Sequence, residues 1–262
     1  MKKTVTIAFA NNKGGSGKTT SCANIGYSLA TLGKKVLLID GDMQLNLSLS
    51  FMDEEKVLEY ATSEKNLYRA VKEQKDLKDY VINTPYENLD IVPSSTLMSS
   101  IEYDLFTMWQ REMILHNILE TIKESKAYDF ILIDAPPTLG GWVMNILCAS
   151  DYIVMPVEAS PWGLFGVANM FDFVDDVKKI NKKLELLGVL ITKVDARKNY
   201  YKQSIDNLRE AEGVEVFDTI IRVDAEVEWA QDNSKPIAVH KKSSRAAAEY
   251  LETAKEIIKK CQ

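Results

Sequence analysis

Short apolar segments alternate along the chain with longer stretches in which apolar residues recur every three to four positions. The short segments are rich in β-branched residues and cover residues 4–10, 35–40, 89–93, 129–137, 152–158, 186–195 and 216–222. Several are apolar on both faces, which is typical of parallel strands covered by helices on each side. The pattern predicts an α/β fold with a doubly wound, mostly parallel sheet, helices on both faces and a ligand site at the carboxyl ends of the strands.

The whole chain, residues 1–262, is predicted to form a single domain. Its 262 residues, 46% of them hydrophobic, suffice for a full core, and the sequence contains no internal repeat, low-complexity segment or flexible linker. Between residues 50 and 88 the pattern becomes charged and less regular. We interpret this stretch as a solvated helical excursion of the same domain.

Charge and cysteine content narrow the class of protein. The formal net charge of -6 means that any contact with nucleic acid must come from a local basic patch. The three cysteines are far apart and the two histidines lie near none of them, which argues against a disulfide framework or a zinc site. The basic start "MKKTVTIAFANN" leads into glycines, and no segment reaches the roughly 18 apolar residues of a spanning helix. We expect a cytoplasmic protein that is neither secreted nor membrane-spanning.

A phosphate-binding loop follows the first predicted strand. The segment "GGSGKTT" precedes a helical pattern that stops at Gly33. Glycines let backbone amides approach phosphates, and a helix N-terminus favours their negative charge. Lys18 would reach the β- and γ-phosphates, while the Thr19 hydroxyl would bind magnesium. The motif predicts a P-loop NTPase whose phosphate-binding residues are Gly14, Gly15, Ser16, Gly17, Lys18, Thr19 and Thr20.

The same loop carries a second lysine. Asn12 stands where the standard spacing G-x-x-x-x-G-K-[ST] requires glycine, so the match is to the deviant form K-G-G-x-G-K-[ST], in which Lys13 precedes the first glycine. Lys13 is either a solvated loop cation or a charge that contacts the nucleotide of a partner subunit, like an arginine finger.

With this loop the chain resembles the ParA/MinD superfamily of deviant Walker A ATPases, and within it the ParA (Soj-type) partition ATPases. Further segments follow the family pattern in the same order, and the resemblance covers nearly the whole length. They are "KVLLIDGDMQLNLS" at 35–48, "FILIDAPPTLG" at 130–140, "SDYIVMPVEASPWGLFGV" at 150–167 and "SKPIAVHKKSSRAAAEYLETAKEI" at 234–257.

The resemblance implies an ATPase that uses ATP and Mg²⁺ and forms a homodimer when ATP binds. Lys13 would act on the partner's nucleotide together with the catalytic residues Lys18 and Asp42, of which Asp42 would position or activate the attacking water. Asp40 would help to order the magnesium shell, and Asp134 would be the Walker B carboxylate. Slow hydrolysis, stimulated by a ParB-like centromere-binding adaptor, would separate the dimer.

Near these carboxylates two residues depart from the family pattern, and one pair of glycines allows two interpretations. Met43 replaces the usual proline, and Trp142 stands where the family has small or aliphatic residues, from which we expect tuning of the site. Gly140 and Gly141, after two prolines, form either a mobile loop that senses the γ-phosphate or an ordinary turn.

The segment "ITKVD", residues 191–195, is the candidate base-binding element, through Thr192 and Asp195. T-K-x-D at a strand end also resembles the guanine-recognition element of signal-recognition GTPases. Lys13 and the spacing of Asp42 and Gln44 favour adenine, with a signal-recognition-like GTPase as an alternative.

Nonspecific DNA binding by the ATP-bound dimer is a further implication of the resemblance. The matching stretch "DARKNYYKQS" offers Arg197, Lys198 and Lys202, although a solvated helical face would look the same. With no segment before the first strand to carry a helix-turn-helix, we expect no sequence-specific operator binding.

The second DNA-contacting stretch of the family is altered here. Glu226 stands where the resemblance aligns an arginine, and Arg222 is the one basic residue nearby. We therefore expect DNA binding to be weakened or moved towards Lys241, Lys242 and Arg245.

The C-terminal segment predicts an amphipathic helix that closes the fold. Small residues and mixed charge favour docking on the sheet over the membrane binding of MinD-like relatives. Its apolar stripe is Ala247, Tyr250, Leu251, Ala254, Ile257 and Ile258. The sequence thus favours an ATP-dependent, nucleoid-associated partition switch without stable membrane insertion. The alternative is a MinD-like positioning or regulatory ATPase whose Glu226 region binds a protein or membrane surface.

Overall fold

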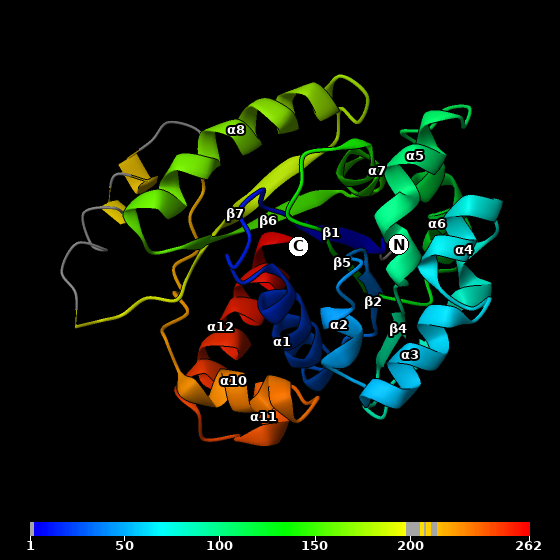
Figure 1. Cartoon of the computed structure of the whole chain (residues 1–262). Helices are drawn as coiled ribbons and strands as arrows, with labels where there is room; N and C mark the ends of the chain where they lie inside the picture. The colour runs from blue at the N-terminus through cyan, green and yellow to red at the C-terminus, as the bar shows by residue number, and fades with distance from the viewer. Residues whose placement is uncertain (1–2, 198–204, 207, 211–213) are drawn as a thin grey trace.

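The computed structural model describes residues 3–197, 205–206, 208–210 and 214–262, and among them seven strands form one sheet in the order β3-β4-β2-β5-β1-β6-β7 (Figure 1). All neighbouring strands are parallel except β3 and β4, which are antiparallel. The strands are β1 (Val5–Phe9), β2 (Val36–Asp40), β3 (Ile82–Asn83), β4 (Leu89–Val92), β5 (Phe130–Asp134), β6 (Tyr152–Glu158) and β7 (Glu185–Thr192).

Helices connect the strands and complete the chain. They are α1 (Lys18–Thr31), α2 (Asn46–Leu49), α3 (Glu54–Thr62), α4 (Leu67–Glu73), α5 (Ile101–Phe106), α6 (Ile114–Ser125), α7 (Gly141–Ala149), α8 (Pro161–Lys178), α10 (Ala225–Asp232), α11 (Ile237–His240) and α12 (Arg245–Lys260). Two short 3-10 helices, η1 (Leu77–Tyr80) and η2 (Thr96–Ser100), flank β3 and β4.

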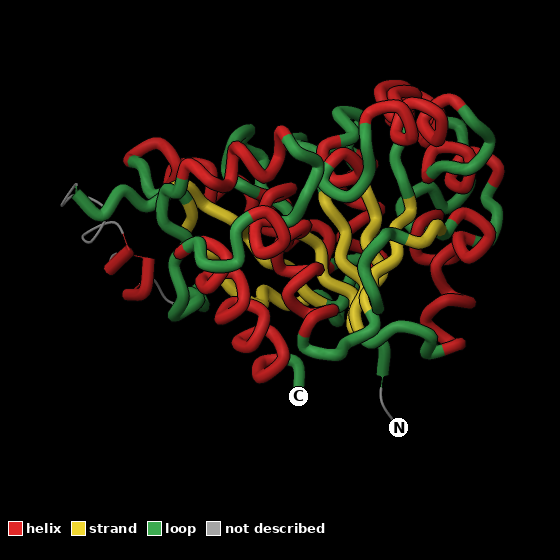
Figure 2. The backbone as a smooth tube through the Cα atoms, turned by 90° about the horizontal axis from the view of Figure 1, so that it is seen from below, coloured by secondary structure: helices red, strands yellow, loops and turns green. Residues whose placement is uncertain are grey.

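Alternate residues of each central strand enter two separate cores. In β1, Ile7 and Phe9 pack with α1 and α12, whereas Ala8 packs with α6, α7 and α8 on the opposite face. Figure 1 shows α8 on one side of the strands and α1 with α12 on the other, and Figure 2 shows the strands enclosed between helices. The predicted fold class, a mostly parallel sheet covered on both faces, is confirmed.

The order of the strands positions the functional edge of the sheet. The chain leaves β1, crosses one face through α1 and enters β2, whereas it leaves β5, crosses the other face through α7 and enters β6. Because these crossovers diverge to opposite faces, a crevice opens at the carboxyl ends of β1 and β5.

The prediction of a strand over residues 216–222 is wrong. Val216 forms an isolated parallel bridge to Val189 of β7, and Arg222 forms one to Val194 just beyond β7, but no continuous strand joins the two bridges. The carboxylate of Glu256 in α12 accepts the N–H groups of Asp218 and Thr219 at 3.0 and 2.8 Å. These donors are therefore satisfied by α12 and not by a neighbouring strand.

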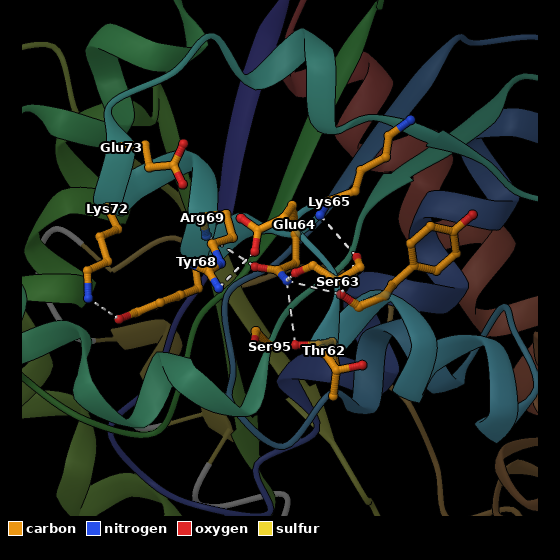
Figure 3. A network of polar contacts seen from close by, with 12 residues as sticks. Thr62, Ser63, Glu64, Lys65, Tyr68, Arg69, Lys72, Glu73 and Ser95 are labelled. Atoms are coloured by element: carbon orange, nitrogen blue, oxygen red, sulfur yellow. Dashed lines mark hydrogen bonds and ion pairs between the residues drawn. The ribbon is translucent and has the colours of Figure 1, made fainter.

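Within residues 50–88 the predicted helices are present as α3, α4 and η1, but residues 82–83 form β3 of the sheet. Nor is α4 solvated on all sides, because Leu67, Ala70 and Val71 enter the core. The turn between α3 and α4, seen in Figure 3, is held by the buried side chain of Asn66. Its amide group donates to the Ser63 carbonyl at 2.8 Å, and its oxygen caps α4 at the Arg69 N–H, 3.1 Å away.

The C-terminal helix closes the fold as expected. Ala247, Tyr250, Ala254 and Ile257 of its apolar stripe are buried, and α12 lies beside α1 (Figure 1). No helix in the described part of the chain combines the length and the apolar character that a membrane crossing requires.

Candidate functional site

The loop between β1 and α1 has the backbone of a phosphate cradle. Gly15 and Gly17 have φ of 74° and 87°, a left-handed conformation that favours glycine. Gly17 precedes α1 and provides no side-chain cap, so the first amides of the helix face outward, as an anion requires. The Thr192 hydroxyl at the end of β7 donates to the Ser16 carbonyl at 2.8 Å and supports the loop from behind.

A cavity of about 850 Å³ opens in front of this loop. Pockets of this size accommodate a nucleotide-sized ligand. The predicted residues Gly14 to Thr20, Asp42, Thr192 and Asp195 line it, whereas Lys13, Asp40, Asp134 and Arg197 are not among its lining residues. Its far wall comes from segments that the sequence analysis did not assign to the nucleotide: residues 221–224, Val227, Glu228, Gln231, Asp232 and Tyr250.

This far wall is tied to the phosphate loop. The Gln231 amide in α10 donates to the Thr20 hydroxyl at 2.9 Å, and the Ile237 N–H donates to the Asn24 side chain of α1 at 2.8 Å. The sequence pattern had suggested DNA contacts for this stretch, or contacts of the Glu226 region with a protein or membrane surface, but none with the nucleotide. A usable signal was Asp224, a capping residue that begins a helix just after the last apolar segment.

Lys18 lies buried in the loop. Its ammonium group donates to the carbonyl of Lys13 at 3.2 Å. Burial lowers the pKa of Lys18, while the negative charges of Asp134 and Asp42 oppose that shift. The loop thus holds a cation, largely removed from solvent, where phosphates would bind.

Lys13 has a different environment. Its ammonium group lies 3.3 Å from Glu158 Oε2 at the end of β6 and 3.4 Å from the Ser160 hydroxyl. About a third of each side chain of the ion pair is exposed. Lys13 is therefore bound within its own chain, but a partly exposed pair of this kind stabilises the fold little and can be exchanged for another anion.

Asp40 and Asp134 end adjacent strands in register and are both fully buried. Asp40 accepts the Ser48 N–H at 2.8 Å, the Ser48 hydroxyl at 2.6 Å and the Asp42 N–H at 3.3 Å. Burial raises the pKa of Asp40 to about 6, although its bonds to Ser48 oppose the shift. Asp40 thus braces the turn that carries Asp42.

Asp134 is left without such bonds. Neither carboxylate oxygen has a hydrogen-bond partner in good geometry among the described residues. Burial, followed by the charge of Asp40, raises its pKa well above the usual range, while the nearby Thr19 hydroxyl and Lys18 favour the ionised form. A buried carboxylate without partners points to a group that the folded chain does not itself supply.

Magnesium with its waters fits this arrangement. Mg²⁺ retains several waters and takes few protein ligands, so the Thr19 hydroxyl together with phosphate oxygens could hold it, and Asp134 could accept hydrogen bonds from its waters. No cluster of three His, Cys, Asp or Glu side chains in the described ranges could hold a metal by itself. Asp40 is already bonded to Ser48, so its predicted part in the metal shell stays a prediction.

The turn after β2 presents Asp42 to the cavity. Asp42 is nearly buried, and its Oδ1 accepts the Gln44 N–H at 3.0 Å. Loop 135–140, after β5, contributes Pro137 to the same cavity. Gly141 and Trp142 at the start of α7 are held by Glu102 of α5, which accepts their N–H groups at 2.9 and 3.0 Å.

The predicted base residue Asp195 lines the cavity and contacts the predicted DNA residue Arg197, which does not line it. Asp195 binds the Arg197 guanidinium through two bonds of 2.8 Å, and Arg197 is otherwise highly exposed. The hydroxyl of Thr192 is used on the phosphate loop. Lys198 and Lys202 lie outside the described residues.

The altered second stretch is neutralised within the chain. Glu226 forms ion pairs with Lys241 at 2.6 Å and, when the imidazole is protonated, with His240 at 3.4 Å. Arg222 lines the cavity, and its guanidinium pairs with Glu249 of α12.

The other basic residues considered for DNA contact, Arg245 and Lys242, differ in whether they are bonded within the chain. Arg245 donates to the Val223 carbonyl at 2.6 Å, whereas Lys242 is exposed. Together with the ion pair of Lys241, these contacts reduce the positive charge available on this surface.

Comparisons with known proteins agree with this geometry. A family model described as an AAA domain matches residues 4–186. The chain is 36% identical over 252 residues to the sporulation initiation inhibitor protein Soj of Bacillus subtilis strain 168, covering 96% of this chain and 97% of the relative. It is 30% identical over 253 residues to the chromosome partitioning protein ParA of Caulobacter vibrioides strain NA1000 / CB15N, covering 96% and 93%.

A solved structure of a partition protein has a similar fold. A putative plasmid partition protein from Borrelia burgdorferi B31 bound to AMPPNP superposes with a TM-score of 0.81 at 26% identity, covering 99% of this chain and 100% of that one.

Proposed function

The chain belongs to the ParA/MinD superfamily of P-loop ATPases and is ParA-like within it, and from this premise we propose that it is a partition ATPase that dimerises on binding Mg-ATP. The observation that carries the proposal is the contrast between two lysines of one loop. Lys18 is buried in the phosphate cradle, whereas Lys13 stands at the rim in a partly exposed ion pair.

The nucleotide and the metal that fit the site are ATP and Mg²⁺. Lys18 and the amides at the start of α1 would bind the phosphates, while Asp42, at the cavity wall, would orient the attacking water. Bound magnesium would neutralise charge on the phosphates. The products are ADP and phosphate.

The dimer would form by exchange of the ion pair of Lys13. In a face-to-face pair of subunits, the ammonium group would leave Glu158 and bind the phosphates of the partner's nucleotide, which carry more negative charge than one carboxylate. ATP binding would thereby favour the dimer, and hydrolysis would dissolve it.

The test compares Lys13→Ala with the wild type. We expect the variant to bind ATP as a monomer with affinity within about threefold of wild type, because Lys18 and the loop amides remain. ATP-dependent dimerisation, followed by light scattering, should be lost, and hydrolysis should fall by about 1,000-fold or more, as for removal of an arginine finger.

The matched control is Glu158→Gln, which breaks the same ion pair but keeps the lysine. It should still dimerise with ATP. Normal dimerisation of Lys13→Ala would reduce Lys13 to a loop cation and refute the proposed switch.

The surface partners follow from the same proposal. The ATP-bound dimer would bind DNA nonspecifically through Arg197, with Lys198 and Lys202, and a ParB-like adaptor would stimulate hydrolysis in the cytoplasm at the nucleoid. Highly exposed Arg197 supports this, because its partner Asp195 lines the nucleotide cavity. ATP-dependent retention on DNA should fall steeply with added salt, since bound phosphates release counterions. Salt-insensitive retention would contradict it.

A second candidate function is favoured by Glu226. Its ion pairs with Lys241 and His240 leave little positive charge where the family aligns an arginine. A MinD-like positioning or regulatory ATPase that acts on a protein or membrane surface would need no such charge. Sedimentation with anionic liposomes in the presence of ATP, together with absent DNA retention, would favour this candidate.

A further inference from the structure

The turn that carries Asp42 is clamped at Gly41 from two sides. The Gly41 N–H donates to the Asp134 carbonyl at 3.0 Å, and its own carbonyl accepts the indole N–H of Trp142 at 2.9 Å. A Cβ on Gly41 would come within 2.6 Å of the Asp134 carbonyl and 3.1 Å of Ile146, so the clamp requires glycine. Gly41, the residue that precedes Asp42, thus has one bond to β5 through its N–H and one to α7 through its carbonyl.

Trp142 makes its bond in a dry environment. It is 2% exposed and is among the largest fully buried side chains of the protein. A hydrogen bond is electrostatically stronger in such surroundings than in water, and a buried carbonyl that loses its donor has no water to replace it. The indole therefore fixes the orientation of the Gly41 peptide and, through it, the turn at Asp42.

The same tryptophan is held from the surface of the molecule. Gly140 gives α7 no side-chain cap, and the carboxylate of Glu102 binds the N–H groups of Gly141 and Trp142 in its place. A Cβ at Gly140 would overlap this carboxylate, so the glycine permits the contact. A carboxylate is also the favoured charge at a helix N-terminus.

These contacts form one continuous series. Glu102 in α5 binds the start of α7, Trp142 in α7 binds Gly41, and Gly41 precedes Asp42 at the cavity wall. The start of α7 also follows loop 135–140, in which Pro137 lines the cavity. A shift of α7 is therefore felt at Asp42 through a bond that an aliphatic side chain at position 142 could not make.

We propose that Trp142 is a positioning residue for ATP hydrolysis. Through its bond to the Gly41 carbonyl it fixes the position of the Asp42 carboxylate, and Glu102 in turn fixes the position of Trp142 through the start of α7. This inference rests on the proposed function, because it assigns Asp42 to the water that attacks ATP. Trp142 itself is not among the residues that line the nucleotide cavity. Its effect belongs to the chemical step and not to the binding of ATP.

The test is Trp142→Phe, which keeps an aromatic ring but removes the N–H donor together with part of the buried indole volume. We expect kcat to fall by about ten- to 100-fold, the loss that small misplacements of a reacting group produce, while KM for ATP stays within about twofold. Trp109→Phe, the same substitution at a site that is 92% exposed, is the matched control and should leave both constants unchanged.

A double-mutant cycle with Asp42→Ala separates positioning from a general loss of structure. If Trp142 acts through Asp42, adding Trp142→Phe to Asp42→Ala should lower kcat by less than about twofold. Multiplicative losses in the double variant would overturn the proposal, as would a wild-type kcat for Trp142→Phe.

Glu102→Gln decides the case if Trp142→Phe does not fold, because Glu102 is exposed and its replacement leaves the core intact. It should lower kcat by about threefold with KM unchanged, the effect of weakening one cap, and unchanged kcat would overturn the inference.

Asp42→Ala alone tests the proposed function: if it hydrolyses ATP like the wild type, the role of Asp42 is refuted. If it is inactive while Trp142→Phe is normal, the inference about Trp142 alone fails.

Discussion

The strands β2 and β5 both end in a buried aspartate, but the two carboxylates differ in their hydrogen bonding. Asp40 and Asp134 lie opposite each other in register, and both side chains are fully buried. Asp40 is bonded to Ser48 and to the backbone of Asp42, whereas Asp134 has no hydrogen-bond partner in good geometry in the described part of the chain. The comparison shows that an aspartate's position at a strand end does not by itself decide whether it braces the fold or is available to a ligand. The difference lies in whether the fold itself satisfies the carboxylate.

The largest effect should come from removing the unsatisfied carboxylate. Asp134→Asn keeps the shape but removes the charge that would bind the waters of magnesium, so ATP hydrolysis should fall by about 100-fold or more. The ligand-free protein should gain stability at pH 7, because burial and the charge of Asp40 raise the pKa of Asp134, so that its carboxyl group destabilises the folded protein at this pH whereas an amide does not. Phosphate release and urea unfolding measure the two quantities.

A matched measurement sharpens this contrast. Adding Mg²⁺ to the ADP complex should raise the midpoint of thermal unfolding for the wild type and much less for Asp134→Asn, because binding to the folded state stabilises it. An equal response of both proteins would contradict a role for Asp134 in the metal shell.

The proximity of the two carboxylates followed from the sequence, because the carboxyl ends of parallel strands share one edge of a sheet. Their different bonding did not, because it depends on Ser48, which reaches Asp40 from the next helix. The far wall of the cavity was missed for a related reason. Periodicity reports which residues are buried, but not which element they face.

The failed strand at residues 216–222 has the same physical origin. Its apolar pattern was real, as the complete burial of Phe217 shows. The decisive contact is the Glu256 carboxylate, which binds the backbone from α12, 37 and 38 residues further along the chain. Local sequence encodes extension and burial, whereas the partner of a backbone donor is settled by tertiary structure.

The second prediction concerns pH and the satisfied carboxylate. The pKa of Asp40 is raised from 3.8 to about 6, so between these values the folded protein keeps a proton that the unfolded chain has lost. The free energy of unfolding of the ligand-free protein should therefore fall as pH rises from about 4 to about 6. Two pKa units correspond to about 3 kcal/mol from this group.

The comparison protein for this measurement is Asp40→Asn, whose amide oxygen can still accept from Ser48. Relative to the wild type it should gain stability as pH rises through the same window, by up to about 3 kcal/mol at pH 7. Urea unfolding at several pH values gives the difference directly. A difference that does not change with pH would show that burial does not raise the pKa of Asp40.

The smallest effect should come from the hydroxyl that satisfies Asp40. Ser48→Ala removes the 2.6 Å bond to the carboxylate but keeps the backbone bond at 2.8 Å. Hydrogen bonds to charged groups contribute about 1.5–3 kcal/mol, so stability at pH 7 should fall by about 1–2 kcal/mol with one of two donors remaining. Ser50→Ala is the control, because its hydroxyl donates to the Asn46 carbonyl, which still accepts the Ser50 N–H. The loss in Ser48→Ala should shrink at pH 4, where Asp40 is protonated and the charge that strengthens the bond is absent. An equal loss at both pH values would mean that the serine supports the turn by packing and not by satisfying the carboxylate.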